Sequence, residues 1–175
     1  MHRFQIRPTL IATIMTAVIF AARLALAGEQ LAVNESAQLP ASPDAVWQLT
    51  GDFGGVDKWA RGLSKVEIID GKDNQKGAIR AITTSGGAYI TEELVAYSKA
   101  QRMLRYRILS GPLPVKNYVS TFSVKAKGDG CEVNWSSTFE PSPTSGLDAA
   151  KTREVIAGIY SGGLKGLREK FPAKQ

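Results

Sequence analysis

Histidine and cysteine are almost missing from the 175-residue sequence, which holds one of each, His2 and Cys131. A single Cys cannot form an internal disulfide or a thiolate metal cluster, and we interpret Cys131 as a small buried hydrophobic residue. If His2 is lost with the N-terminal leader described below, catalysis by Ser–His or Cys–His pairs and metal sites that contain His are excluded. Walker-type and dinucleotide-binding glycine loops are also missing, so we expect neither a metal ion nor a cofactor.

An uncharged run long enough to cross a bilayer is missing as well. The apolar run over residues 10–22 follows Arg3 and Arg7 and is closed by Arg23, and it is shorter than the roughly 20 residues that a membrane-spanning helix needs. Residues 25–27 read Ala-Leu-Ala, the small-x-small pattern of a signal-peptidase site. We therefore expect a signal peptide over residues 1–27 and a single domain over residues 28–175, exported to the periplasm without a stable membrane anchor. A retained anchor is the alternative.

A strong charge imbalance is also missing once the leader is set aside. The whole chain carries a formal charge of +6, and removal of three Arg and no acid with the leader lowers it to +3. Arg102, Arg105 and Arg107 alternate along a predicted strand, which is typical of one solvated face of a sheet. We therefore expect no nucleic-acid partner.

What the sequence does contain is a succession of strands between helical segments. A strand over residues 31–39 is followed by a short helix that begins at Ser42 and Pro43, and by a second short helical segment ending near Trp59. Turn residues then separate six predicted strands, at residues 65–70, 78–84, 89–97, 103–109, 115–127 and 131–140. The links are short, which favours an antiparallel meander.

A long helix is expected over residues 147–171. Its apolar residues recur at spacings of three and four and predict one buried stripe: Ile156, Ile159, Tyr160, Leu164, Leu167 and Phe171. A curved sheet buries its concave face by packing against such a helix. The predicted fold is therefore α+β of the helix-grip type, a curved antiparallel sheet of about seven strands around the C-terminal helix, with two short helices after the first strand.

Strand alternation assigns the inward side chains. Leu104, Tyr106 and Ile108 are opposed by Arg105 and Arg107, so even positions point inward there. The same parity selects further inward positions on the next strand along and on the preceding one: Tyr118, Ser120, Phe122 and Val124, and Ile90, Glu92, Leu94 and Ala96. A two-residue turn at 128–129 places position 122 opposite 135, with Val133, Trp135, Ser137 and Phe139 inward.

Two charged residues fall on this inward face. If the turn at residues 85–87 holds three residues, Arg80 lies inward and directly opposite Glu92, within ion-pairing range. A two-residue turn at 86–87 would turn Arg80 outward. A buried charge is costly unless it is paired, hydrated or bound, so the pair is either a structural ion pair in a partly wet interior or, with Tyr106, Tyr118 and Ser120, the polar anchor of an apolar pocket.

Glycines at positions 158, 162 and 166 recur within the final helix. Each costs about 1 kcal/mol of helix stability relative to Ala, so we expect the missing side chains to have a structural or functional role. Close packing of the helix on the sheet is one interpretation, and room for a ligand or for the backbone of a partner is the other.

Several segments resemble the SRPBCC (START, Bet v 1-like) superfamily, in its polyketide cyclase/dehydrase-like branch, from residue 31 to about residue 170. The segments that carry the resemblance are residues 42–47 (SPDAVW), 51–59 (GDFGGVDKW), 77–80 (GAIR), 91–94 (TEEL) and 113–118 (LPVKNY). The resemblance implies the helix-grip fold and a ligand cavity between sheet and helix.

The sequence is also similar to plant abscisic-acid receptors of this superfamily. In those receptors, a gate loop and a latch loop cover the cavity. The resemblance implies that Ser85, Gly86 and Gly87 belong to the corresponding gate loop, and that Pro112, Leu113 and Pro114 belong to the corresponding latch loop. It further implies a cavity lined by Arg80, Ile82, Glu92, Tyr106, Ile108, Tyr118 and Ser120. The gate is shorter here and the latch has prolines where those receptors have His and Arg, so hormone recognition is not carried over.

These observations lead to one main hypothesis and two alternatives. We expect a periplasmic module that encloses a small apolar or amphipathic molecule, with a cavity lined by Trp59, Arg80, Ile82, Glu92, Tyr106, Ile108, Tyr118, Ser120, Phe122, Trp135 and Ile159. The first alternative is an accessory protein for a periplasmic redox enzyme such as methanol dehydrogenase, because exported SRPBCC members occur beside such enzymes; the outer Arg105 and Arg107 would then matter more. The second is a cofactor-free cyclase or dehydratase, with Glu92 as general acid or base and with Tyr106 or Tyr118 polarising a carbonyl.

Overall fold

The computed structural model describes residues 29–173. The predicted signal peptide, including His2, falls outside these residues, and its cleavage stays a prediction. No helix within the described part of the chain is long and apolar enough to cross a membrane.

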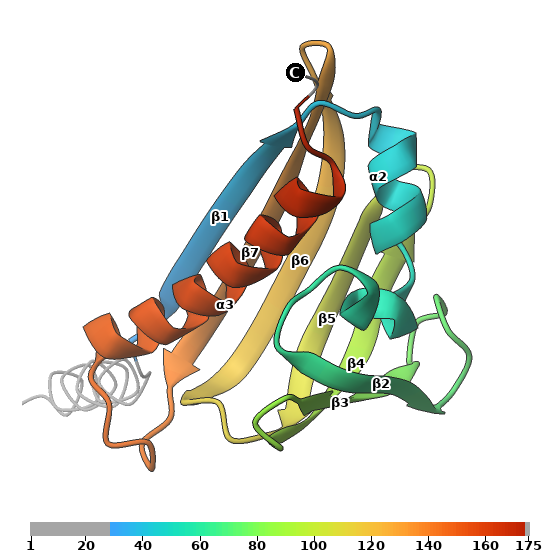
Figure 1. Cartoon of the computed structure of the whole chain (residues 1–175). Helices are drawn as coiled ribbons and strands as arrows, with labels where there is room; N and C mark the ends of the chain where they lie inside the picture. Colours follow the sequence, from blue (N-terminus) through green and yellow to red (C-terminus); the bar gives the residue numbers. More distant parts are fainter. Residues whose placement is uncertain (1–28, 174–175) are drawn as a thin grey trace, which may run out of the picture.

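One antiparallel sheet of seven strands, in the spatial order β1-β7-β6-β5-β4-β3-β2, forms the body of the protein (Figure 1). The strands are β1 (Leu31–Leu39), β2 (Leu63–Asp70), β3 (Ile79–Thr84), β4 (Tyr89–Ser98), β5 (Met103–Ser110), β6 (Val115–Lys127) and β7 (Gly130–Pro141). β2 to β7 follow each other as a meander, and β1 pairs with β7 at one edge. This is the order that short hairpin connections allow.

The hairpin turns set the register that aligns the inward side chains. The turn between β6 and β7 holds Gly128 and Asp129 and places Phe122 opposite Trp135. The turn between β3 and β4 holds three residues, 85–87, because the Thr84 amide donates to the carbonyl of Ala88. Gly87 takes the positive φ of +82° that this turn requires. Arg80 therefore pairs directly with Glu92, as the three-residue alternative predicted.

Within residues 29–173, three helices complete the fold: α2 (Pro43–Thr50), the 3₁₀ helix η1 (Phe53–Lys58) and α3 (Ala149–Lys170). Ser42 caps α2 by accepting from the amide of Ala45, and Asp148 caps α3 by accepting from the amide of Lys151. Figure 1 shows α3 lying along the sheet. α2 contacts β6 and β7, and η1 contacts α2 and β2. These elements confirm the predicted α+β helix-grip fold.

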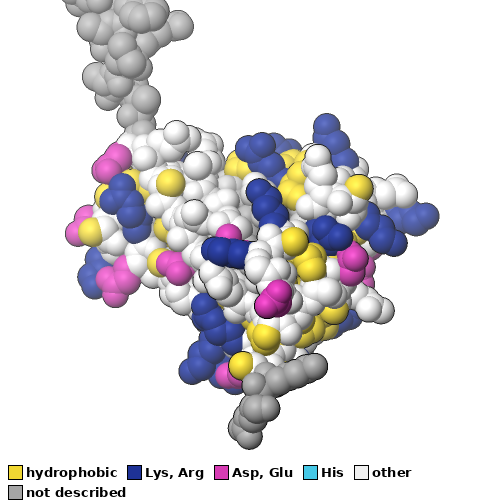
Figure 2. Space-filling model, turned by 90° about the horizontal axis from the view of Figure 1, so that it is seen from above, with side chains coloured by type: hydrophobic (Ala, Val, Ile, Leu, Met, Phe, Trp, Pro, Cys, Tyr) yellow, Lys and Arg dark blue, Asp and Glu magenta, His cyan; other side chains and the backbone are white. Residues whose placement is uncertain are grey.

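The core lies between the sheet and the helices. The largest fully buried side chains include Phe53, Phe122, Phe139, Leu94 and Tyr160. Cys131 is also buried, and this burial raises the pKa of its thiol. On the outside, Lys and Arg side chains are interspersed with Asp and Glu over the face shown in Figure 2.

Three predictions of side-chain position were wrong. Ala96 does not point inward, because a β-bulge between Leu94 and Ala96 shifts the register and pairs Tyr97 with Leu104. Tyr97 therefore packs inward, with its ring centroid 5.9 Å from that of Trp47. Ile159 is 42% exposed and does not belong to the buried stripe of α3. Arg102 precedes β5, with a φ of +47°, and forms a salt bridge to Asp44.

Candidate ligand-binding site

A cavity of about 320 Å³ lies between the concave face of the sheet and α3. Its wall is mostly apolar and is contributed by η1 and the segment that follows it, by β2 to β7 and by α3. The lining residues are Val56, Ala60, Arg61, Gly62, Leu63, Arg80, Ile82, Thr84, Ala88, Ile90, Glu92, Tyr106, Pro112, Leu113, Tyr118, Trp135, Ile156, Gly158, Ile159, Tyr160, Gly162 and Gly163.

The Arg80–Glu92 ion pair forms one polar wall of the cavity. Arg80 Nε and Nη2 both contact Glu92 Oε2, at 2.7 and 2.6 Å, and the two side chains are 4% and 8% exposed. Arg80 Nη1 donates to the carbonyl of Phe53 at 2.5 Å. The guanidinium carbon also lies 4.2 Å from the ring centroid of Phe53 and 4.9 Å from that of Tyr106. These contacts compensate for the loss of water around both charges.

A hydrogen-bonded group of side chains forms a second polar wall. Tyr118 Oη lies 2.5 Å from Tyr160 Oη, which lies 3.0 Å from Ser120 Oγ. Trp135 Nε1 donates to Tyr106 Oη at 2.9 Å and to Ser120 Oγ at 3.1 Å. The indole of Trp135 stacks on the ring of Tyr160, with centroids 4.4 Å apart. The group links β5, β6 and β7 to α3 in a single network.

The three tyrosines of this network are held neutral. Burial raises the pKa of Tyr106, Tyr118 and Tyr160 above the ordinary value, and the negative charge of Glu92 adds to each increase. They therefore act as hydrogen-bonding groups and not as bases at neutral pH.

The glycines of α3 fall into two pairs. A Cβ at Gly166 would lie 2.3 Å from the carbonyl oxygen of Trp59, and one at Gly163 would lie 2.7 Å from the ring of Trp135, so both are sites of close packing. A Cβ at Gly158 or Gly162 would meet nothing within 4 Å, and both residues line the cavity. Of the two interpretations offered for the glycine spacing, close packing holds for Gly166 and open space for Gly158 and Gly162.

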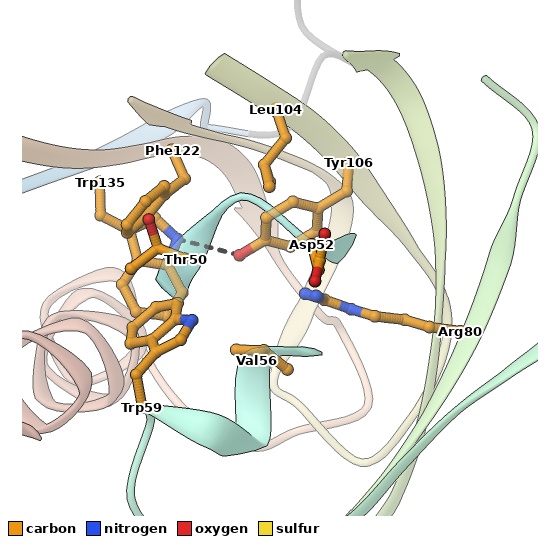
Figure 3. Close-up of a pocket in the computed structure, with 9 residues that line it drawn as sticks. All are labelled: Thr50, Asp52, Val56, Trp59, Arg80, Leu104, Tyr106, Phe122 and Trp135. Atoms are coloured by element: carbon orange, nitrogen blue, oxygen red, sulfur yellow. Dashed lines mark hydrogen bonds between the residues drawn. The ribbon is translucent and has the colours of Figure 1, made fainter. Parts of the chain in front are cut away.

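A smaller pocket of about 10 Å³ lies beside the cavity, between Trp59, Phe122 and Thr50 (Figure 3). Its volume is about that of a single water molecule. Figure 3 shows the guanidinium of Arg80 directed into this pocket, with the hydrogen bond between Trp135 and Tyr106 on its other side. Trp59 Nε1 is buried there without a hydrogen-bond partner among the described residues.

The structure brings together most of the residues predicted to line a pocket. Those that line the main cavity are Arg80, Ile82, Glu92, Tyr106, Tyr118, Trp135, Ile159, Pro112 and Leu113. Whether they bind a ligand stays a prediction. Ile159 lines the cavity with a side chain that is partly open to solvent.

The other predicted residues lie outside the main cavity, for different reasons. Trp59 and Phe122 line the smaller pocket. Ser120 is fully buried and bonded to Trp135 and Tyr160, and Ile108 lines neither pocket. Of the predicted gate loops, Ser85, Gly86 and Gly87 form the exposed turn itself, so the flanking Thr84 and Ala88 line the cavity instead; Pro114 also lies outside its lining.

Tyr160 is the most informative residue that the sequence analysis did not include in the site. It was assigned to the buried stripe of the helix together with apolar residues. It is the one member of that stripe with a hydroxyl group, and a buried hydroxyl needs a hydrogen-bond partner. That requirement is a signal that Tyr160 has a polar partner on the sheet, but it does not identify which residue that partner is.

Comparisons with known proteins identify the family. The family described as "Polyketide cyclase / dehydrase and lipid transport" matches residues 30–172. No curated protein sequence matches this chain. Among solved structures, XoxI from Bacillus cereus is 31% identical with a TM-score of 0.73, over 80% of this chain and 94% of that one.

Two further solved structures are similar to this chain. An uncharacterised protein from Bacillus thuringiensis is 30% identical with a TM-score of 0.74, over 82% of this chain and 100% of its own. Ara h 8.0201, at 17% identity and a TM-score of 0.67 over 82% of this chain and 98% of its own, shows likeness of fold alone. The chain therefore belongs to the polyketide cyclase/dehydrase and lipid transport family, within the SRPBCC superfamily.

Proposed function

We propose that this protein binds one small, mostly apolar molecule in the cavity between the sheet and α3, and that it does so in the periplasm. The cavity itself is the observation that carries the proposal, because its volume of about 320 Å³ and its apolar wall with two polar groups are typical of small-molecule sites. The periplasmic location rests on the leader predicted over residues 1–27.

The α3 glycines support this proposal. Gly158 and Gly162 face open space, so neither is needed for close packing. Each costs about 1 kcal/mol relative to Ala in a helix interior. Absence of a side chain at these two positions keeps the α3 side of the cavity free for a ligand.

A fluorescent probe and a blocking variant test the proposal. N-phenyl-1-naphthylamine is uncharged and brightens in apolar surroundings, so we expect saturable binding of one molecule per chain. Gly162→Leu introduces a side chain on the cavity wall without a clash at its Cβ, and it should abolish the binding. Ser161→Leu places the same side chain at the adjacent exposed position of α3 and should leave the binding unchanged. Equal binding by the two variants would contradict the proposal.

The cavity supports catalysis less well than binding. Glu92 is the one carboxylate among the lining residues, and its Oε2 is occupied by two nitrogens of Arg80. A cyclase or dehydratase would show turnover of an enolisable ketone that Glu92→Gln abolishes.

The accessory-protein alternative depends on the outer face of β5. Arg107 there is already paired with Glu93 at 2.6 Å, which reduces the charge open to a partner. Co-purification of a periplasmic redox protein that is lost on reversal of Arg105 and Arg107, at low salt, would support this role.

A further inference from the structure

We propose that the molecule bound in this cavity is uncharged and donates a hydrogen bond to the protein, as an alcohol or a phenol does, and that carboxylates are rejected. This inference rests on the proposed function, because it concerns the ligand of the same cavity. It follows from which polar atoms of the wall already have their partners.

The first free atom is Glu92 Oε1. Both contacts of Arg80 with this carboxylate go to Oε2, and no hydrogen bond to Oε1 is formed within residues 29–173. Among residues 29–173, the fully buried side-chain nitrogen and oxygen atoms that lack a hydrogen-bond partner are Trp59 Nε1 and Ser137 Oγ. Glu92 Oε1 also lacks a partner but is not one of these atoms, so it is accessible, and the surface that Glu92 lines is the cavity. An ionised carboxylate oxygen only accepts hydrogen bonds.

The second acceptor is Tyr118 Oη. Whether it donates or accepts in its hydrogen bond to Tyr160 follows from counting the hydroxyl protons of the network. Ser120 Oγ donates its one proton to the carbonyl of Ser136 at 2.9 Å, because a carbonyl can only accept. Tyr160 must therefore donate to Ser120, and Tyr118 must in turn donate to Tyr160. With its proton committed, Tyr118 Oη can only accept a hydrogen bond from a ligand.

Neither cation that lines the cavity is free to receive an anion. Arg80 is paired with Glu92, bonded to the carbonyl of Phe53, and directed into the smaller pocket (Figure 3). Arg61, the other lining cation, forms a salt bridge to Glu169. A carboxylate would lose its hydration and meet the acceptors Glu92 Oε1 and Tyr118 Oη. The hydroxyl of Tyr106, which accepts from Trp135 and keeps its own proton, would offer it an uncharged donor but no compensating charge. A hydroxyl group would donate to one of the two acceptors and would bring no further charge into the cavity.

Three probes with one carbon skeleton test this inference on the intact protein. 2-Naphthol donates a hydrogen bond, 2-methoxynaphthalene only accepts, and 2-naphthoate is an anion. In calorimetric titrations at pH 7 we expect 2-naphthol to bind about tenfold more tightly than 2-methoxynaphthalene, as befits a hydrogen bond to a charged acceptor. 2-Naphthoate should bind most weakly of the three.

Two variants and two controls locate the preference. Tyr118→Phe removes one acceptor without altering a charge and should lower the preference for 2-naphthol by about two- to tenfold. Arg80→Met combined with Glu92→Leu removes the other acceptor without leaving an unpaired charge and should lower it further. Tyr89→Phe at an exposed position and Glu93→Gln on the outer face should leave the preference unchanged.

The outcomes separate this inference from the proposed function. If N-phenyl-1-naphthylamine binds in the cavity while 2-methoxynaphthalene or 2-naphthoate binds as tightly as 2-naphthol, only the inference on ligand class is overturned. The same holds if 2-naphthol fails to bind where the larger probe does, or if its preference survives in both variants. If no probe of either kind binds, the proposed function fails, and this inference with it.

Discussion

Glu92 and Glu93 are neighbours in the sequence with opposite surroundings. Because side chains alternate along β4, Glu92 pairs with Arg80 inside the protein, whereas Glu93 pairs with Arg107 on its outer face. Their side chains are 8% and 21% exposed, respectively. The two residues therefore form a matched pair for measuring what the inner salt bridge contributes.

Glu92→Gln should lower the free energy of unfolding by about 3–5 kcal/mol, because it leaves the guanidinium of Arg80 buried without an opposite charge. Glu93→Gln should cost less than about 1 kcal/mol, because Arg107 remains solvated. Urea unfolding followed by tryptophan fluorescence measures both. Equal losses in the two variants would show that Arg80 does not depend on Glu92.

The buried tyrosines predict a loss of stability at alkaline pH. Burial raises the pKa of Tyr106, Tyr118 and Tyr160 in the folded protein, whereas in the unfolded chain they ionise near pH 10. Above that pH the unfolded state holds fewer protons than the folded state, so the free energy of unfolding falls by up to about 1.4 kcal/mol per pH unit for each such tyrosine.

Unfolding titrations between pH 8 and pH 11 measure this slope. These tyrosines should leave the stability unaffected well below pH 10 and reduce it above. Tyr118→Phe should show a shallower decline than the unaltered protein, and the difference isolates this one residue from Cys131 and the lysines. Identical slopes in the two proteins would be evidence that Tyr118 ionises as freely in the folded state as in the unfolded one.

At the scale of single residues, alternation predicted that Arg80 and Glu92 face each other only if the turn held three residues, and the length of that turn came from the structure. Alternation could not predict the position of Ala96, because the bulge in β4 carries no glycine or proline that marks it. Nor could it predict the contact between Tyr118 and Tyr160, which depends on where α3 crosses the sheet. Contacts between elements distant in the sequence are not encoded in the periodicity of either one.

At the scale of the element, α3 combines a packed end with an open middle. Gly166→Ala forces a Cβ against the backbone of Trp59 at 2.3 Å, so it should lower the free energy of unfolding by about 1–3 kcal/mol, the usual cost of overpacking. Gly158→Ala meets no atom within 4 Å and should raise it by about 0.4–1 kcal/mol, because alanine restricts the unfolded chain. Thermal unfolding of the two variants under the same conditions measures the difference.

Gly162→Ala serves as the control for that comparison, since its added Cβ also meets nothing within 4 Å. It should behave like Gly158→Ala and unlike Gly166→Ala. Destabilisation by all three substitutions would mean that the whole glycine series packs closely and that α3 leaves no room for a ligand.

The element boundaries were predictable because turn residues separate the strands of the meander. The predicted helix over residues 147–171 contains the observed α3, Ala149–Lys170. The spacing of the glycines could not show how close each turn of α3 lies to the rest of the protein. That distance separates Gly166, in contact with Trp59, from Gly158 and Gly162, which face the cavity.

At the scale of the whole molecule, one sheet and one long helix enclose space that their side chains do not fill. The fold class follows from the order of strands and helices, which the sequence displays directly. The volume of the cavity does not, because it depends on how seven strands curve together and on where the segment after η1 closes one side. For the same reason Trp59 and Phe122, predicted as lining residues, fall in the smaller pocket.

The central claim is that the cavity holds one small molecule, and native mass spectrometry of the protein, isolated gently from the cells that produce it, tests it most directly. We predict a bound mass at one equivalent per chain that is retained in Ser161→Leu and lost in Gly162→Leu. Extraction and a second spectrum should show that the released molecule is uncharged and bears a hydroxyl or N–H group. A bound mass that persists in Gly162→Leu, or a protein that is empty in every preparation, would contradict the account.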